Sequence, residues 1–296
     1  MFRRPARTLW GDAWRRFRKH RLAMAGGAMF LFLTAATIIG PIIYHVPIGA
    51  IDFHNARLTP SWAHPFGTND LGQDMLARCL YGGRISIAVG FAAMLVSITL
   101  GTLVGAIAGF FGRTTDHVLM RLTDVFISLP SLPLLLLVLY LYRDGLAKMF
   151  GPQLGIFWLI VVVLGGLNWM PTARLVRAGF LAVKEREFME AARSLGVGPV
   201  SQIFRHILPN TLSPVIVSAT LSVGTAMIAE ATLSFLGLGF PPDIPSWGRL
   251  LYDAQNYLDL APHMALFPGL MICLAVLSIN YVGDGLRDAL DPRKVS

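Results

Sequence analysis

The chain has 296 residues, of which 54% are hydrophobic and 14% charged, and its mean hydropathy is +0.59. A soluble domain carries about 25% charged residues, so this composition excludes an ordinary soluble protein and indicates one embedded in a membrane. The formal net charge is +8, but eight of the 25 Lys and Arg residues lie in the first 21 positions, immediately before an apolar segment. That placement is typical of a membrane protein with a cytoplasmic N-terminus, and we do not expect nucleic acid as a partner.

Six segments are apolar and long enough to cross a hydrocarbon core of about 30 Å, which takes ~20 helical residues. In chain order they are residues 22–43, 85–111, 125–142, 154–169, 212–238 and 264–282. The first resembles a signal peptide, but it has no charge and no small-residue cleavage site follows it, so we predict an uncleaved anchor. The sequence therefore predicts an all-α polytopic membrane protein with six transmembrane helices.

Basic residues predict the orientation of these helices. With the N-terminus inside, 19 of the 25 Lys and Arg residues fall on the cytoplasmic side and 6 on the opposite side. This bias predicts that both chain ends are cytoplasmic. It also brings the basic residues before the first span to the membrane lipid, where they can meet anionic headgroups. Two connections are long, residues 44–84 outside and residues 170–211 inside.

Catalytic motifs are absent from the sequence. There is no HExxH or GxSxG, and no glycine precedes a lysine, which excludes the phosphate-binding GxxxxGK[ST] loop. The seven histidines are scattered, and Cys79 and Cys273 form no CxxC pair. We therefore expect no enzymatic activity, metal or cofactor in this chain. If ATP drives the protein, another chain must bind it.

The cytoplasmic connection predicts a helical hairpin. Phe188, Ala192 and Leu195 fall on one helix face, and Gly196 follows where a left-handed C-cap favours glycine. Pro199 suits the first turn of a second helix. That helix has an apolar stripe and is expected to end at Pro209.

The hairpin has two interpretations. Its apolar face could lie on the membrane surface, or it could dock onto another protein. Glu187 and Glu190 favour docking, because anionic lipid repels carboxylates. The small side chains of Ala191 and Ala192 would also allow a partner's backbone to approach closely.

These residues carry a family resemblance. Glu190-Ala191-Ala192, Gly196 and the Leu-Pro pair at 208–209 resemble the EAA signature of permease subunits in binding-protein-dependent ABC importers, although His206 stands where the general signature has Ile. In that family this loop is the coupling helix that inserts into a groove of the ATPase. The resemblance assigns ATPase coupling to Glu190, Ala191, Ala192, Arg193, Leu195, Gly196, Val197, Gly198 and Pro199.

Other stretches resemble the dipeptide/oligopeptide branch and its C-type subunit. They are FGTNDLGQD at residues 66–74, RLTD at 121–124 with Pro130, LSFLGLG at 233–239 with the following PP and WG pairs, and GDGLRDALDPR at 283–293. The implied fold is the five-helix type I importer core over residues 66–296, with the coupling loop at 170–211. A variable N-terminal part, residues 1–65, would hold the basic segment, the first span and the start of the outer loop.

The resemblance also implies partners and a location. They are a second homologous permease, two cytoplasmic ATPases that bind ATP and Mg²⁺, an extracytoplasmic solute-binding protein and the bacterial inner membrane. The implied cargo is a dipeptide or oligopeptide, with a nickel chelate or a glutathione-like peptide as alternatives. A stand-alone secondary transporter is the competing hypothesis, but it would need several buried charges, and only Glu230 lies within an apolar run.

Three further features predict contacts. In the second span, small residues including Gly101, Gly105 and Gly109 recur every four positions and predict a helix-packing seam, either within the chain or with the second permease. Glu230 either lines the solute path, binding a peptide's amino group, or accepts structural hydrogen bonds. Arg121 and Asp124 are three residues apart and are expected to pair.

Overall fold

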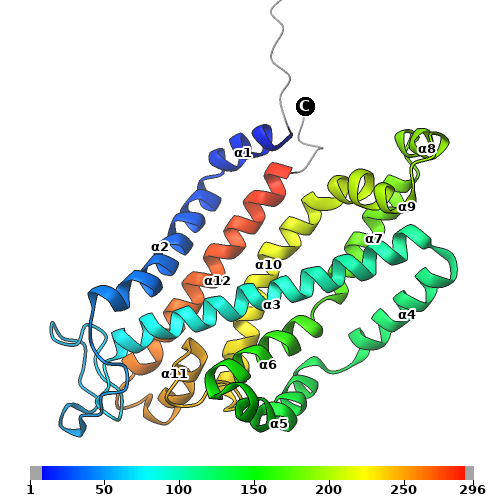
Figure 1. The fold of residues 1–296 in the computed structure, drawn as a ribbon. Helices are drawn as coiled ribbons and strands as arrows, with labels where there is room; N and C mark the ends of the chain where they lie inside the picture. The colour runs from blue at the N-terminus through cyan, green and yellow to red at the C-terminus, as the bar shows by residue number, and fades with distance from the viewer. Residues whose placement is uncertain (1–8, 291–296) are drawn as a thin grey trace, which may run out of the picture.

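The structure is a computed structural model that describes residues 9–290, and its regular elements there are helices running mostly side by side (Figure 1). They are α1 (Leu9–Lys19), α2 (Arg21–Ile43), η1 (Phe53–Asn55), α3 (Met75–Phe111), α4 (Arg113–Ser128), α5 (Ser131–Phe150), α6 (Pro152–Gly166), α7 (Met170–Lys184), α8 (Glu187–Ser194), α9 (Pro199–Ser201), η2 (Gln202–Ile207), α10 (Leu208–Phe235), α11 (Trp247–Ala254), η3 (Gln255–Tyr257) and α12 (His263–Leu290).

The helices account for the predicted spans. Within the described residues, four helices are long and apolar enough to cross a membrane: α2, α3, the continuous helix Pro199–Phe235, and α12. The count rises to six if each of two bent pairs, α4 with α5 and α6 with α7, forms one span. The six-span, all-helical prediction agrees with this architecture.

The third predicted span is broken in the middle. The break lies at Leu129 and Pro130, where α4 and α5 meet at 85°. Pro130 has no N–H group and cannot donate to the Phe126 carbonyl one turn earlier, which accepts from Leu129 N–H at 3.3 Å instead. Residues 125–142 therefore contribute to two helices instead of one straight span.

The fourth span extends beyond its predicted end. It begins as α6, bends by 45°, and continues as α7 through residues expected in the cytoplasmic connection. Ser97 Oγ donates a hydrogen bond to Asn168 O at 2.8 Å, and Asn168 Nδ2 donates to Leu164 O at 2.7 Å. Helix breaks inside a membrane need such partners. The first part of the predicted connection, through Lys184, is therefore helical.

The fifth span begins earlier than expected. Pro209 was expected to end the preceding helix, and this expectation is wrong: the helix runs without a break from Pro199 to Phe235. Pro209 cannot donate to the carbonyl four residues back. The preceding turn, η2, is a wider π-helix, in which Leu208 N–H donates to Ile203 O. This π-helical turn lets the chain pass the proline without stopping.

The bundle has two distinct ends. Figure 1 places α1, α8, α9 and the last turn of α12 at one end, and α11 with the connection between α2 and α3 at the other. We call them the hairpin end and the cap end. At the cap end, Tyr44 donates a hydrogen bond to Asp74 Oδ2 at 2.8 Å, and Asp74 Oδ1 caps α3 by accepting from Ala77 N–H. Burial and this carboxylate raise the pKa of Tyr44 to about 12, so its phenol remains a donor.

Candidate functional site: the helical hairpin

The hairpin, residues 187–207, turns where the sequence predicted. Gly196 has a φ of +76°, so the left-handed C-cap prediction is confirmed. Its N–H donates to Arg193 O at 2.9 Å, and Val197 N–H donates to Ala192 O at 3.1 Å. This pair of hydrogen bonds is the Schellman motif, which satisfies carbonyls at the end of α8. Pro199 then begins α9, also as expected.

One side of the hairpin is fixed to the bundle. Met189 of α8 and Ile207 of η2 are fully buried in a cluster with Phe180 of α7. Arg193 Nη2 also donates to Lys184 O at 2.8 Å. Fully burying a Met, Ile or Phe side chain contributes about 1.5–3 kcal/mol each. The hairpin is therefore packed against α7 and against the helix that continues as α10.

The other side of the hairpin carries exposed apolar side chains. Leu195 is 83% exposed, Val200 69%, Phe204 60% and Phe188 46%. The predicted apolar face is therefore divided, because Ala192 is buried while Leu195 points away from the bundle. Large apolar side chains gathered on an exposed element mark an interaction surface.

Most of the other residues assigned to coupling are also exposed. Glu190, Ala191 and Arg193 are exposed, as are the turn residues Gly198 and Pro199. Val197 is half-buried, and Gln202 Nε2 donates to its carbonyl at 2.6 Å, which ties the turn to η2. Of the nine residues assigned to coupling, only Ala192 is buried, so nearly the whole signature is accessible on the surface of the hairpin.

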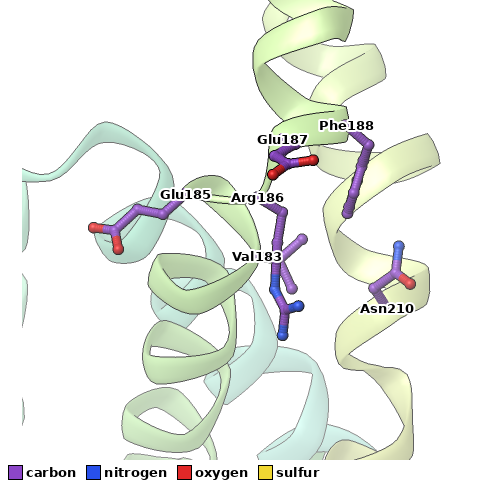
Figure 2. Close-up of a pocket in the computed structure, with 6 residues that line it drawn as sticks. All are labelled: Val183, Glu185, Arg186, Glu187, Phe188 and Asn210. Atoms are coloured by element: carbon purple, nitrogen blue, oxygen red, sulfur yellow. The ribbon is translucent and has the colours of Figure 1, made fainter.

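A pocket of about 800 Å³ opens at the base of the hairpin. Figure 2 shows Phe188 extending from α8 toward α10, where Asn210 lies, with Arg186 between α7 and α10. Glu185 points to the opposite side, away from Phe188 and Asn210. Val183 and Glu187 complete the lining. The pocket offers both charges and an aromatic ring beside the exposed apolar side chains.

The glycine seam of the second span packs within the chain. A Cβ at Gly101 would lie 2.6 Å from Trp169 O, one at Gly105 would lie 2.4 Å from Ala173 O, and one at Gly109 would lie 2.6 Å from Phe180 Cβ. These distances are too short for any side chain. Of the two interpretations of the seam, the geometry favours close packing of α3 against α7.

Two ion pairs join α4 to α7. Arg174 Nη2 lies 2.6 Å from Asp124 Oδ1, and Arg177 binds both carboxylate oxygens of Asp116. The predicted partner of Asp124 was Arg121, three residues away, and the pairing with Arg174 corrects it. Spacing along one helix could not reveal a partner 50 residues later.

Glu230 is completely buried at the cap end of α10. Its Oε1 accepts hydrogen bonds from Ser234 Oγ at 2.7 Å and Ser246 Oγ at 2.8 Å, and its Oε2 accepts one from Ser86 Oγ at 3.0 Å. Both carboxylate oxygens are occupied by groups of the chain itself. This arrangement favours the structural interpretation of Glu230 over a role in the solute path.

Sequence reasoning missed the three serines. Ser234 lies four residues after Glu230 on the same helix, so helical spacing could have found it. Ser86 and Ser246 come from other elements, and only the folded structure brings them to the carboxylate.

The fold defines a polytopic helical membrane protein with a protruding helical hairpin. Residues 101–296 match the family described as the binding-protein-dependent transport system inner membrane component, and residues 8–60 match the N-terminal transmembrane domain of oligopeptide transport permease C. The chain belongs to the binding-protein-dependent transport permease family, and it is therefore a multi-pass membrane protein.

Named relatives resemble almost the whole chain. The glutathione transport system permease protein GsiD of Pectobacterium atrosepticum is 38% identical over 98% of this chain and 93% of its own. The oligopeptide permease OppC of Bacillus subtilis is 37% identical, covering 97% and 90%. The dipeptide permease DppC of Alkalihalophilus pseudofirmus is also 37% identical, covering 97% and 91%.

A solved structure shares the fold. Inward-facing conformations of the MetNI methionine ABC transporter superpose with a TM-score of 0.57. The match covers 73% of this chain and 98% of that chain at 18% sequence identity. It supports the type I importer permease core and says nothing about the cargo.

Proposed function

We propose that this chain is a permease subunit of an ATP-driven importer and forms half of the translocation pathway for dipeptides or oligopeptides. The observation that carries the proposal is the hairpin, which is buried on one side and exposes Leu195, Val200 and Phe204 on the other. A partner that binds these side chains could move α7 and α10 through the buried cluster around Met189.

Membership of the permease family supports a set of partners. Two cytoplasmic ATPases would bind ATP and Mg²⁺ and receive the hairpin, with the pocket beside Phe188 and Arg186 taking part of their surface. A second homologous permease would complete the pathway, and an extracytoplasmic binding protein would deliver the cargo at the cap end. The hairpin end and both chain ends would then be cytoplasmic in a bacterial inner membrane, as the basic residues predict.

The names of the relatives support peptides as cargo, because two of them are oligopeptide and dipeptide permeases. Glutathione is the second candidate, since it is itself a small peptide and a relative of similar identity is named for its transport. The pathway between the two permeases would bind the peptide without covalent chemistry.

Reconstitution with all partners in proteoliposomes tests the proposal. We expect saturable uptake of dipeptides, oligopeptides or glutathione that requires ATP, the ATPases and the binding protein. Competition among these three solutes identifies the cargo. Uptake driven by an ion gradient without the ATPases would contradict the proposal and favour a secondary transporter.

A further inference from the structure

The cap end contains an element that is wedged between two long helices. Residues 236–262, which we call the outer cap, connect α10 to α12 and contain α11. Ser246 and Trp247, at the start of α11, are fully buried. A Cβ at Gly248 would lie 2.7 Å from Ala231 O of α10, and one at Gly82 of α3 would lie 3.2 Å from the Ser246 carbonyl carbon. Close backbone contact therefore holds the start of α11 against both helices.

Directed hydrogen bonds join this helix start to Glu230. Trp247 N–H donates to Ser86 Oγ at 3.1 Å, and Arg249 N–H donates to Ser246 Oγ at 3.1 Å. Both serines donate their hydroxyl protons to the Glu230 carboxylate. Because a serine hydroxyl has a single proton, accepting from the amide and donating to the carboxylate is a fully consistent pattern.

The arrangement also brings the N-terminus of α11 close to the negative charge of the Glu230 carboxylate. Amide groups at a helix N-terminus lack helical acceptors and carry partial positive charge. Through Ser86 and Ser246, the first turn of α11 faces the carboxylate of Glu230. Ser234 provides a third hydroxyl donor from α10 itself. Glu230 thus joins α3, α10 and α11 at one point, which we call the latch: Glu230, Ser86, Ser234 and Ser246.

Two members of the latch, Glu230 and Ser234, lie on the helix that also carries the second half of the hairpin. The helix Pro199–Phe235 is continuous for 37 residues, beginning beside the hairpin turn and ending five residues after Glu230. With a rise of 1.5 Å per residue, Pro199 and Glu230 are roughly 45 Å apart along it. Figure 1 shows α10 running from the hairpin end to the cap end of the bundle.

We propose that Glu230 is a positioning residue that latches the outer cap to α3 and α10, so that the cap moves as one body with the helix that carries the hairpin. Displacement of the hairpin at one end would then move the cap at the other. This inference rests on the proposed function, because it assumes that a partner displaces the hairpin.

Hydrogen exchange in the complete transporter, reconstituted in nanodiscs, tests the latch itself. Glu230→Gln keeps the shape of the side chain but removes its charge and places an amide donor where hydroxyl protons point. We expect the amides of residues 247–250 to exchange about tenfold faster, since a charge-assisted hydrogen bond is lost. The exchange rates of the amides in residues 210–220 of α10 should be unchanged.

Thr232→Ala is the matched control, because its exposed hydroxyl donates to Ile228 O within its own helix and does not belong to the latch. It should leave the exchange of α11 unaltered. Ser86→Ala is a second variant in case Glu230→Gln prevents assembly, and it should also speed exchange, because it removes the acceptor of Trp247 N–H. Unchanged exchange of residues 247–250 in an assembled Glu230→Gln or Ser86→Ala transporter would overturn the latch.

A second measurement tests whether the latch transmits motion. With alanyl-alanine as the probe, the amount taken up per ATP hydrolysed should fall severalfold in Glu230→Gln, and to a smaller extent in Ser86→Ala. A ratio equal to wild type would show that the latch is only structural and would overturn the one-body proposal. If the wild-type transporter takes up no peptide while the exchange result holds, the proposed function fails and the latch stands.

Discussion

Replacing Leu195 with Ala removes an apolar side chain that touches little of its own chain. Leu195 is 83% exposed, so the free energy of unfolding should change by less than about 0.5 kcal/mol. If an ATPase buries this side chain, its burial contributes about 1.5–3 kcal/mol to docking. Ala retains part of that, so we expect a loss of about 1.5–2 kcal/mol, or roughly tenfold to thirtyfold in affinity.

The assay is a titration of the permease pair in nanodiscs with purified ATPase subunits. Leu260→Ala is the matched control, because Leu260 is also an exposed leucine, at 69%, but lies in the outer cap. It should leave the affinity unchanged. A Leu195→Ala affinity within twofold of wild type, or an equal loss in Leu260→Ala, would refute the reasoning that the hairpin is the docking element.

Two glycine substitutions test the packing of the hairpin and of α3. Gly196→Ala places a Cβ at a φ of +76° and should cost about 1 kcal/mol of hairpin stability, seen as faster hydrogen exchange of α8, whereas Gly198→Ala, at a φ of −67° in open space, should be neutral. Gly105→Val should destabilise the chain by about 1–3 kcal/mol or more, because its Cβ would lie 2.4 Å from Ala173 O. Gly27→Ala, with 3.7 Å to its nearest neighbour, is the control in thermal unfolding; equal melting temperatures for the two variants would contradict the α3–α7 seam.

Sequence reasoning succeeded where the determining chemistry is local. Gly196 and Pro199 predict the turn of the hairpin, because left-handed φ values and first-turn positions favour these residue types. The apolar runs likewise predict the spans from composition and length. The glycine repeat of α3 predicts a close neighbour, but it does not say that the neighbour is α7.

It failed where the outcome depends on segments distant in sequence. Pro209 is predicted to end a helix, but the π-helical turn before it accommodates the missing N–H group and the helix continues. Asp124 pairs with Arg174, far along the chain, instead of Arg121. Two of the serines around Glu230 come from α3 and the outer cap. Because the sequence does not show that these serines bind the carboxylate, it left a role for Glu230 in the solute path open.

Cross-linking in assembled transporter tests the central claim most directly. Leu195→Cys and Leu260→Cys are compared in a chain with the exposed Cys273 replaced by Ser, since Cys79 is buried. With a thiol-reactive photo-crosslinker, position 195 should form an adduct with the ATPase subunit, and position 260 should form none. An actively transporting complex that gives no ATPase adduct at position 195, or gives it only at position 260, would contradict the account.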